Sequence, residues 1–280
     1  MTDWRTIKKI DAHIHILPDE VHVANPNSED VWVYAYIEKY RKIMRRYNIK
    51  KAVIMPLNDP WLMSMDFTVS AVHKNLYEMK RKYSDQFYAF ADIDTRNPSV
   101  ASVDAICLAI EEFDLDGIKV HPNNTGVPLD SEYNQAIFAF AQDRKIPVAV
   151  HSYPNSEKDF CSVIRVESIL KRFPYLRMIV SHMGAFQWEQ LLHTNTYVDF
   201  SAVLPAYSAF YGINRTNEIM RMFGPERLIF ATDYPDNRSV QPNRIYPAYF
   251  DILNRMDFTE SEANQIARGN IESVLNSMKQ

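Results

Sequence analysis

The sequence predicts an α/β protein folded as a single-domain (β/α)₈ barrel, a TIM barrel, over residues 1–280. Short apolar runs alternate with amphipathic segments along the chain, which indicates strand–helix–strand units and a parallel sheet. We count eight such runs, and eight units within 280 residues match the usual size of this barrel. No Pro-, Gly- or Ser-rich linker divides the chain into separate parts.

The expected strands are short and strongly apolar. Runs such as AVIMPL, VAVH and LIFAT are nearly continuous in apolar residues, as is typical of parallel strands buried on both faces. The eight expected strands cover residues 10–16, 52–57, 87–93, 117–121, 147–151, 178–182, 197–202 and 228–232.

Amphipathic segments between these strands predict helices on the outside of the barrel. Asp130 or Ser131 is expected to cap the helix that follows it. Near the end of the chain, Thr259 and Glu262 have the spacing of a capping box and predict a C-terminal helix. The helical segments that we distinguish cover residues 31–47, 67–83, 99–112, 131–144, 161–173 and 259–278.

Composition excludes several classes of protein. The chain has 31 Lys and Arg against 35 Asp and Glu, a net charge of −4, and no long basic block, so a nucleic-acid partner is not expected. We find neither an apolar run long enough to cross a membrane nor a signal peptide, and we expect a cytoplasmic protein. A doubly wound open sheet is the alternative fold. A G-x-G-x-x-G motif is missing after the first strand, which disfavours dinucleotide binding.

Histidines are concentrated at the ends of the expected strands. Five of the eight occupy these positions, and Asp233 directly follows the last strand. In a parallel barrel the carboxyl ends of all strands open onto one rim, where active sites form. The five histidines are His13, His15, His121, His151 and His182.

The motif His13-Ile14-His15 is the clearest sign of a metal site. Residues two apart on a strand face the same side, so both imidazoles point the same way. A pair of hydrogen-bonded histidines is the simpler explanation, but the other strand-end groups favour a metal. His151 is the natural third ligand and Asp233 the natural anionic ligand. Nitrogen and oxygen donors of this kind suit one divalent ion, Zn²⁺ in the first place, with Mn, Fe, Co or Ni as alternatives.

Five segments, taken in order, resemble the amidohydrolase superfamily: DAHIHILP, GIKVHP, VAVHS, IVSHMG and IFATDYP. The chain is most similar to the amidohydrolase-2 branch, which includes aminocarboxymuconate-semialdehyde decarboxylases and 2-pyrone-4,6-dicarboxylate lactonases. The resemblance extends from residue 10 to Asn270 and implies a distorted TIM barrel with a divalent metal inside its C-terminal rim.

The resemblance also implies roles for individual residues. His13, His15, His151 and Asp233 would hold one Zn²⁺. His182 would contact the water on that metal. A lysine in the position of Lys119 is carboxylated and bridges two metals in binuclear relatives. In this branch a single metal is usual, so we expect Lys119 to contact an anionic substrate instead.

The expected function is hydrolysis of a small, carboxylate-bearing ester, lactone or amide by a metal-activated water. Asp233 would move protons and His182 would stabilise charge on the attacked oxygen, so both are predicted catalytic residues. Lys119, His121 and Arg238 are the predicted substrate-binding residues. The alternative is non-oxidative decarboxylation of an unsaturated or aromatic acid at the same metal site. A PHP-type phosphoesterase is disfavoured because ATDYP follows the last strand.

The remaining expectations concern the loops and the partner. The strand-end loops offer further substrate contacts: Asn58, Asp59, Trp61, Asp94, Thr95, Arg96, Asn123, Asn124, Tyr153, Asn155, Tyr234, Asp236, Asn237 and Arg244. The polar loop 18–30 is a candidate lid. Sixteen Tyr and fifteen Phe are expected to serve barrel–helix packing and a subunit interface, so we expect a homodimer.

Overall fold

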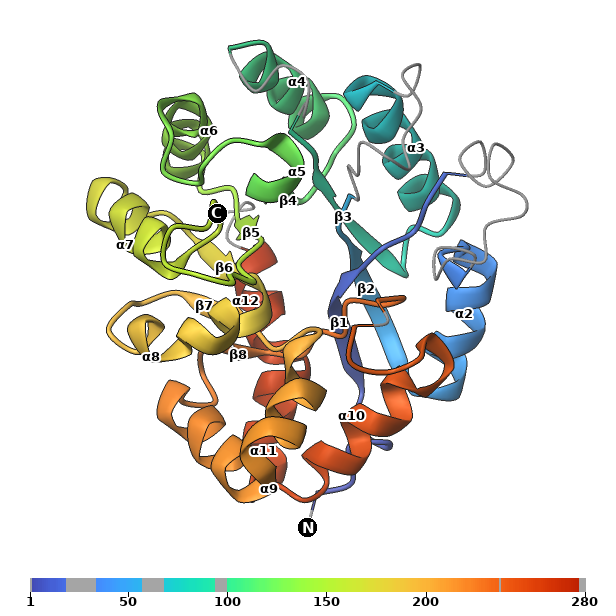
Figure 1. The fold of residues 1–280 in the computed structure, drawn as a ribbon. Helices are drawn as coiled ribbons and strands as arrows, with labels where there is room; N and C mark the ends of the chain where they lie inside the picture. Colours follow the sequence, from blue (N-terminus) through green and yellow to red (C-terminus); the bar gives the residue numbers. More distant parts are fainter. Residues whose placement is uncertain (1, 19–33, 57–67, 94–99, 237, 277–280) are drawn as a thin grey trace.

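A computed structural model describes residues 2–18, 34–56, 68–93, 100–236 and 238–276 of the chain. Eight parallel strands follow one another around a barrel in sequence order (Figure 1). They are β1 (Lys9–Ile14), β2 (Ile49–Ile54), β3 (Phe87–Ala91), β4 (Gly117–Val120), β5 (Val148–Val150), β6 (Met178–Val180), β7 (Tyr197–Asp199) and β8 (Leu228–Ile229).

The last strand returns to the first and closes the barrel. The Ala12 amide donates to the Phe230 carbonyl at 3.0 Å, and the His15 amide donates to the Tyr234 carbonyl at 2.7 Å. Beyond the short β8 the chain leaves regular pairing, and an isolated parallel bridge between Ile14 and Tyr234 continues the closure. The predicted distorted TIM barrel is therefore confirmed.

Helices surround the sheet and connect its strands (Figure 1). They are α2 (Ile37–Arg46), α3 (Val69–Lys82), α4 (Val100–Glu111), α5 (Pro122–Thr125), α6 (Glu132–Asp143), α7 (Val163–Arg172), α8 (Trp188–Leu191), α9 (Val203–Phe223), α10 (Ile245–Leu253), α11 (Glu260–Asn264) and α12 (Asn270–Asn276). Two 3₁₀ segments, Ser181–Gln187 and Pro242–Arg244, lie in the loops after β6 and β8. None of the helices in the described ranges is long and apolar enough to cross a membrane.

Local sequence signals explain several helix ends. The Ser131 hydroxyl accepts from the Tyr133 amide and begins α6, so Ser131 rather than Asp130 is the cap. Thr259 and Glu262 form the predicted capping box at the start of α11. The expected C-terminal helix is a helical run in three parts, because a π-helical segment over Gln265–Gly269 separates α11 from α12.

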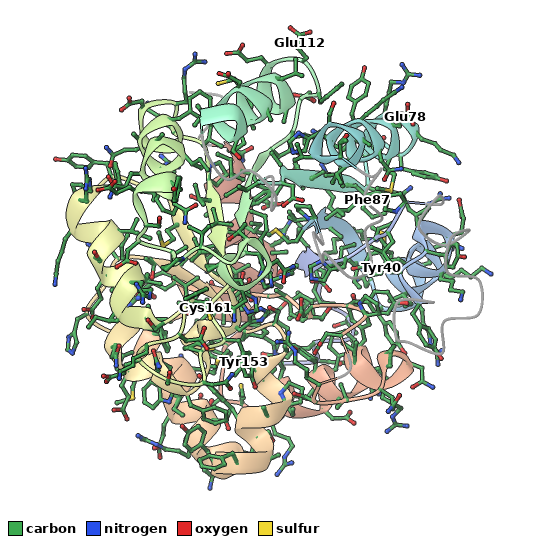
Figure 2. The ribbon with its side chains drawn as sticks, turned by 45° about the horizontal axis from the view of Figure 1, so that its top comes forward. Tyr40, Glu78, Phe87, Glu112, Tyr153 and Cys161 are labelled. Carbon is green, nitrogen blue, oxygen red and sulfur yellow. The ribbon has the colours of Figure 1, made fainter. Side chains whose placement is uncertain are left out.

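The core has two layers. The larger one packs the helices onto the outside of the barrel, with Tyr40 and Phe87 among its members, whereas Glu78 and Glu112 lie on the exposed faces of their segments (Figure 2). A smaller buried cluster from the inward faces of the strands fills the barrel: Ile10, Ala12, Val53, Met55, Phe90, Ala149, Ile179, Ile229 and Ala231. Side chains of α12 join this cluster, so the C-terminal helix covers one end of the barrel.

Each of the eight observed strands ends before its predicted carboxyl end. β5 and β6 stop at Val150 and Val180, one and two residues before His151 and His182. β7 stops at Asp199 rather than at residue 202. The residues beyond each end leave the ladder and place their side chains at the carboxyl rim, which is where the candidate site lies.

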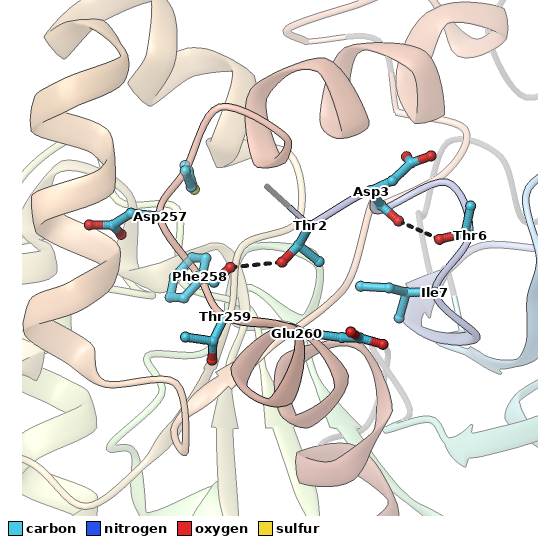
Figure 3. Close-up of a pocket in the computed structure, with 9 residues that line it drawn as sticks. Thr2, Asp3, Thr6, Ile7, Asp257, Phe258, Thr259 and Glu260 are labelled. Carbon is cyan, nitrogen blue, oxygen red and sulfur yellow. Dashed lines mark hydrogen bonds between the residues drawn. The ribbon is translucent and has the colours of Figure 1, made fainter.

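A separate cavity of about 580 Å³ lies near the amino end of β1 (Figure 3). The Thr2 hydroxyl donates to the Phe258 carbonyl at 2.9 Å, and the Thr6 hydroxyl donates to the Asp3 carbonyl at the same distance. None of the residues that the sequence analysis selected for chemistry is among its described lining residues.

Candidate metal centre

One cavity at the carboxyl rim of the barrel gathers the predicted metal, catalytic and substrate-binding residues. Its volume is about 430 Å³. The eight residues predicted to bind metal, bind substrate or act in catalysis come from the ends of five different strands, and all of them line it. The lining consists of His13, His15, Lys119, His121, Asn123, Asn124, His151, Tyr153, Asn155, His182, Asp233, Asp236 and Arg238.

The tightest cluster in this cavity is formed by His13, His15 and Asp233. Oδ1 of Asp233 lies 3.1 Å from Nε2 of His13 and 3.0 Å from Nε2 of His15. All three side chains are buried. Donor atoms about 2.1 Å from one Zn²⁺ are separated by about 3.0–3.4 Å, depending on the angle between them. The observed spacing therefore suits three ligands of one divalent ion.

Hydrogen bonds on the far side of each ring determine where its proton sits. Nδ1 of His15 is 2.9 Å from the Met55 carbonyl, and Nδ1 of His13 is 3.2 Å from a carboxylate oxygen of Asp199. Both partners are acceptors, so each Nδ1 carries the proton and each Nε2 carries a lone pair. Two nitrogen lone pairs and a carboxylate oxygen thus converge on one point. A cation between them removes the repulsion, so this donor set fits a divalent metal.

A break in the pairing of β1 directs His13 toward the site. The register of β1 against β2 shifts between Asp11 and Ile14. The buried Asp11 carboxylate accepts from the amides of His13, at 3.2 Å, and Thr232, at 3.1 Å. It also bonds the hydroxyls of Thr232 and Tyr246, each at 2.6 Å. Asp11 thereby joins β1 to the segment that leads into Asp233.

Asp233 is held from several directions at once. Its backbone has φ 63°, in the left-handed region that a residue other than glycine seldom adopts. Its amide donates to the His13 carbonyl at 2.8 Å, and its second oxygen, Oδ2, accepts from Arg238 at 2.5 Å. Arg238 also donates to Asp236 at 2.8 Å and lies over the Tyr153 ring. The carboxylate therefore presents Oδ1 to the histidines while Arg238 holds Oδ2.

His151 lies in the same cavity but outside the tight cluster. Its Nδ1 is 3.1 Å from Nε2 of His182, and its ring stacks on His121 with centroids 3.9 Å apart. His151 stays a predicted third nitrogen ligand. His121 caps α5, and its Nδ1 accepts from the Asn124 amide at 3.3 Å. The proton of a neutral His121 is therefore on Nε2, which makes this ring a hydrogen-bond donor and suits the predicted contact with substrate.

Lys119 lies beside the cluster on the inward face of β4. Its Nζ is 3.4 Å from Nε2 of His13 and donates to the Ser181 hydroxyl at 3.2 Å. Burial lowers the pKa of Lys119 to about 8, and the carboxylates of Asp199 and Asp233 oppose that shift. The amine is therefore predominantly protonated at neutral pH.

Burial also governs the acid–base state of the other groups. It lowers the pKa of His13, lowers that of His151 well below the ordinary value, and lowers that of His182 to about 3. These rings are neutral at physiological pH. Burial alone would raise the pKa of Asp233, but the facing His13 and His182 rings hold it well below its usual range. Burial, followed by the charge of Asp233, raises the pKa of Asp236 to about 6.

A second group of metal-type side chains shares His13 with the first: His13, His182 and Asp199. The Ser201 hydroxyl fills its centre, 3.2 Å from Nδ1 of His13 and 3.0 Å from Nδ1 of His182, and donates to Asp199. Asp199 and Ser201 do not line the cavity. This group is a closed hydrogen-bond network behind the site. Asp199 and Ser201 are not among the residues predicted from the sequence, although an Asp at the end of an apolar strand was a usable signal.

Several other predicted contacts are not part of the cavity. Arg244 is exposed in its 3₁₀ segment, away from the lining residues. Tyr234 packs in the core, and its hydroxyl donates to the Tyr34 carbonyl at 3.0 Å. The following predictions lie outside the described residues: Asn58, Asp59, Trp61, Asp94, Thr95, Arg96, Asn237 and the loop 18–30 beyond Pro18.

A parallel barrel with a His and Asp cluster at its carboxyl rim defines a metal-dependent barrel enzyme. The family model described as Amidohydrolase matches residues 10–276, and the chain belongs to that family. The predicted superfamily branch is thereby confirmed. A comparison with curated protein sequences found no match.

Solved structures with the same fold have little sequence in common with this chain. A 2,6-dihydroxybenzoate decarboxylase from Rhizobium is 15% identical with a TM-score of 0.68, covering 97% of this chain and 99% of its own. A 4-oxalomesaconate hydratase from Rhodopseudomonas palustris is 17% identical with a TM-score of 0.69, covering 97% and 96%. A 5-carboxyvanillate decarboxylase from Novosphingobium aromaticivorans, complexed with manganese and a nitrobenzoic acid, is 16% identical with a TM-score of 0.71, covering 99% and 98%.

Proposed function

We propose that this protein is a metal-dependent hydrolase of small esters, lactones or amides that carry a carboxylate. The observation that carries the proposal is the convergence of the His13, His15 and Asp233 donor atoms at 3.0–3.1 Å. We assign His151 as the third nitrogen ligand and Zn²⁺ as the most suitable ion, with Mn, Fe, Co or Ni as alternatives. A divalent ion held there supplies a more acidic water and polarises a substrate carbonyl.

The residues of the chain would divide the remaining work. Asp233 is ionised, so it accepts the proton of the attacking water and returns it to the leaving group. Arg238 and Lys119 give the cavity two cations to bind a substrate carboxylate, and Nε2–H of His121 adds a donor. His182 is predicted to stabilise charge on the attacked oxygen. To do so it would have to open its contact with His151 and carry a proton on Nε2, because its Nδ1 is already bonded to the Ser201 carbonyl.

Non-oxidative decarboxylation is a second candidate. Two of the three solved structures named above are decarboxylases of aromatic acids, which supports an acid substrate for this cavity. The same cations would bind the carboxylate that is lost. Because both reactions use an anionic substrate, the cavity alone supports either, and product analysis separates them.

Metal content and product identity test this proposal. Purified protein should contain about one equivalent of divalent metal, whereas two equivalents would indicate a carboxylated Lys119 and none would overturn the proposal. Carboxylate-bearing lactones, esters and amides, together with hydroxybenzoic acids, should be screened for acid release and for CO₂ in parallel. Acid release without CO₂ supports hydrolysis, and CO₂ release supports the second candidate.

Asp233→Asn tests the proton-transfer step once a substrate is known. We expect turnover to fall by about 10²-fold or more, since general acid–base help has that size, while substrate still binds. Asp236→Asn is the comparison because Asp236 bonds the same arginine but is not part of the His13, His15 and Asp233 cluster. Full activity of Asp233→Asn would exclude Asp233 as the proton carrier.

A homodimer also remains a prediction. Phe186 and Phe210 are 47% and 71% exposed, and their rings lie 5.2 Å apart. Exposed aromatic side chains are common at subunit interfaces, which supports association of two copies. Light scattering on the purified protein measures the mass directly, and a monomeric mass at micromolar concentration would contradict the prediction.

A further inference from the structure

Asp199 and Ser201 have no assigned role, yet both are fully buried directly behind the candidate metal centre. They stand two residues apart at the end of β7 and lie outside the cavity lining. Their contacts with the site are made to the Nδ1 atoms of two histidines, which face away from the cavity. Such contacts determine which nitrogen of a ring carries the proton and which one offers a lone pair.

The acceptors allow the proton of each ring to be assigned in turn. Asp199 Oδ2 accepts from Nδ1 of His13, at 3.2 Å. The Ser201 carbonyl can only accept, so Nδ1 of His182, 3.0 Å away, carries the proton and Nε2 of His182 carries a lone pair. That lone pair faces Nδ1 of His151 at 3.1 Å, so His151 donates from Nδ1 and its Nε2 is also unprotonated.

We propose that Asp199 and the Ser201 carbonyl are positioning groups that set the tautomers of His13 and, through His182, of His151. The inference rests on the proposed metal centre, because it explains how both rings come to present an unprotonated Nε2 to one ion. His182 is in this view the link between β7 and His151. His121 is the contrast within the same cavity, since its Nδ1 accepts a backbone hydrogen bond and its Nε2 keeps the proton.

The surroundings of Asp199 make one substitution more informative than the rest. Its Oδ1 accepts from the amides of His182, at 3.0 Å, and Ser201, at 3.1 Å, and from the Ser201 hydroxyl. In Asp199→Asn, only the amide oxygen can take that place, because all three neighbours are donors. The new NH₂ group then faces Nδ1 of His13 and donates to it. His13 is forced to carry its proton on Nε2, where it blocks metal binding.

Asp199→Ala should be the milder change. It removes the carboxylate without adding a donor, and the Ser201 hydroxyl oxygen at 3.2 Å can still accept from Nδ1 of His13. We therefore expect Asp199→Asn, which conserves the shape of the side chain, to weaken metal binding more than Asp199→Ala. A purely structural role for Asp199 predicts the opposite order, because Asn conserves shape and most hydrogen bonds.

The test combines Zn²⁺ affinity with the tautomer itself. Outer hydrogen-bond partners of metal ligands change affinity by about 10–100-fold, so we expect about 100-fold weaker binding in Asp199→Asn and about 10-fold in Asp199→Ala. ¹⁵N NMR of the metal-free, histidine-labelled protein should show protonated Nδ1 on His13 in the wild type and protonated Nε2 in Asp199→Asn. Ser201→Ala keeps the carbonyl and should leave both tautomers unchanged.

Asp116→Asn is the matched control for loss of a carboxylate that is partly buried and bonded to a backbone amide. Asp116 accepts from the Ala89 amide at 2.9 Å and pairs with Lys80 at 2.8 Å, at the start of β4 and away from the site. Its Zn²⁺ affinity should match the wild type. Equal affinities in Asp199→Asn and wild type, or weaker binding in Asp199→Ala than in Asp199→Asn, would overturn the inference. If the wild type binds no metal, the proposed function fails, while the NMR experiment still decides the tautomers.

Discussion

The residues of strand β1 and His15, which directly follows it, use buried polar side chains in opposite ways in a first and a second half. Lys9 and Asp11 point into the helix layer, where the Lys9 amine donates to the carbonyls of Trp4 and Ile7 and Asp11 receives four hydrogen bonds. His13 and His15 point into the barrel and direct lone pairs at Asp233. In the first half every charge is satisfied by the protein. In the second half the proposed divalent ion would complete the donor set.

The shift of register between Asp11 and Ile14 separates the two halves. Regular alternation along a strand would put all four of these odd-numbered residues on one face. The extra residue in β1 moves His13 and His15 to the inner face and leaves Asp11 behind as the anchor of the break. A structural carboxylate and a functional site are thus two parts of one local distortion.

Residues with a positive φ also differ between the two ends of the barrel. Asn48, Asp114 and Lys145 have φ between 48° and 56° in the turns from a helix into a strand. Among the described residues of the carboxyl rim, five non-glycine residues have φ between 46° and 63°, and none of them is Asn: His182, Met183, Ala185, Ala202 and Asp233. Strained residues of this kind persist where the surrounding structure fixes them, often at functional sites.

Asp11→Ala should have the largest effect on stability. It removes an acceptor from two backbone amides and two hydroxyls that are all buried, so we expect a loss of about 3–5 kcal/mol in the free energy of unfolding. Urea unfolding measures this loss. Tyr246→Phe deletes only one of the four contacts and should cost about 1 kcal/mol, which keeps the prediction testable if Asp11→Ala does not fold. A change below about 1 kcal/mol in Asp11→Ala would mean that the bulge is held by other contacts.

Metal removal should destabilise the protein through the other half of β1. At a free Zn²⁺ concentration about 1,000 times Kd, binding to the folded state adds about 4 kcal/mol. A chelator should remove this increment from the wild type, as followed by thermal unfolding. His15→Ala should show no such increment, whereas Tyr246→Phe should retain it. An increment of wild-type size in His15→Ala would place the metal elsewhere.

Much of this architecture could be predicted from the sequence. Apolar runs locate the strands, and the polar residues that follow them locate the rim, because parallel strands all end on one side. The bulge could not be predicted, since Asp11 and His13 have ordinary strand spacing in the sequence. The role of Asp199 was also out of reach. Its place at the end of an apolar strand marks Asp199 as a candidate, but its role depends on a histidine 186 positions away in the chain.

His73 provides a pH test of a buried histidine outside the site. Its Nε2 accepts from the Asp92 amide at 2.8 Å, and burial lowers the pKa of His73 to about 4. Between pH 6.5 and 4 the unfolded chain binds a proton that the folded protein does not. Stability should therefore fall as the pH drops through this window, by at most about 3 kcal/mol. His73→Gln conserves an acceptor but does not titrate, so its curve should lack this component.

The measurement must compare the two proteins rather than follow the wild type alone. Burial raises the pKa of Asp11 to about 7, so this group contributes stability that is present at low pH and is lost as the pH rises toward 7. It opposes the His73 effect, and it cancels in the difference between wild type and His73→Gln because it is present in both. A pH-independent difference between pH 7.5 and 4 would show that His73 titrates normally.

Lys145→Gly should give the smallest effect and tests the contrast in backbone strain. Lys145 is exposed, has φ 56°, and follows Arg144, the C-cap of α6, at the position where glycine is the favoured residue. We expect the free energy of unfolding to rise by about 1 kcal/mol with no change in Zn²⁺ affinity, measured by urea unfolding and chelator competition.

Ala202→Gly relieves similar strain but removes a buried methyl group worth about 0.8 kcal/mol, so the stability of this variant should be nearly unchanged. It should bind Zn²⁺ more weakly, because Ala202 adjoins the Ser201 carbonyl that bonds His182. Equal gains in both variants, with equal affinities, would mean that strain at the rim does not help to fix the site.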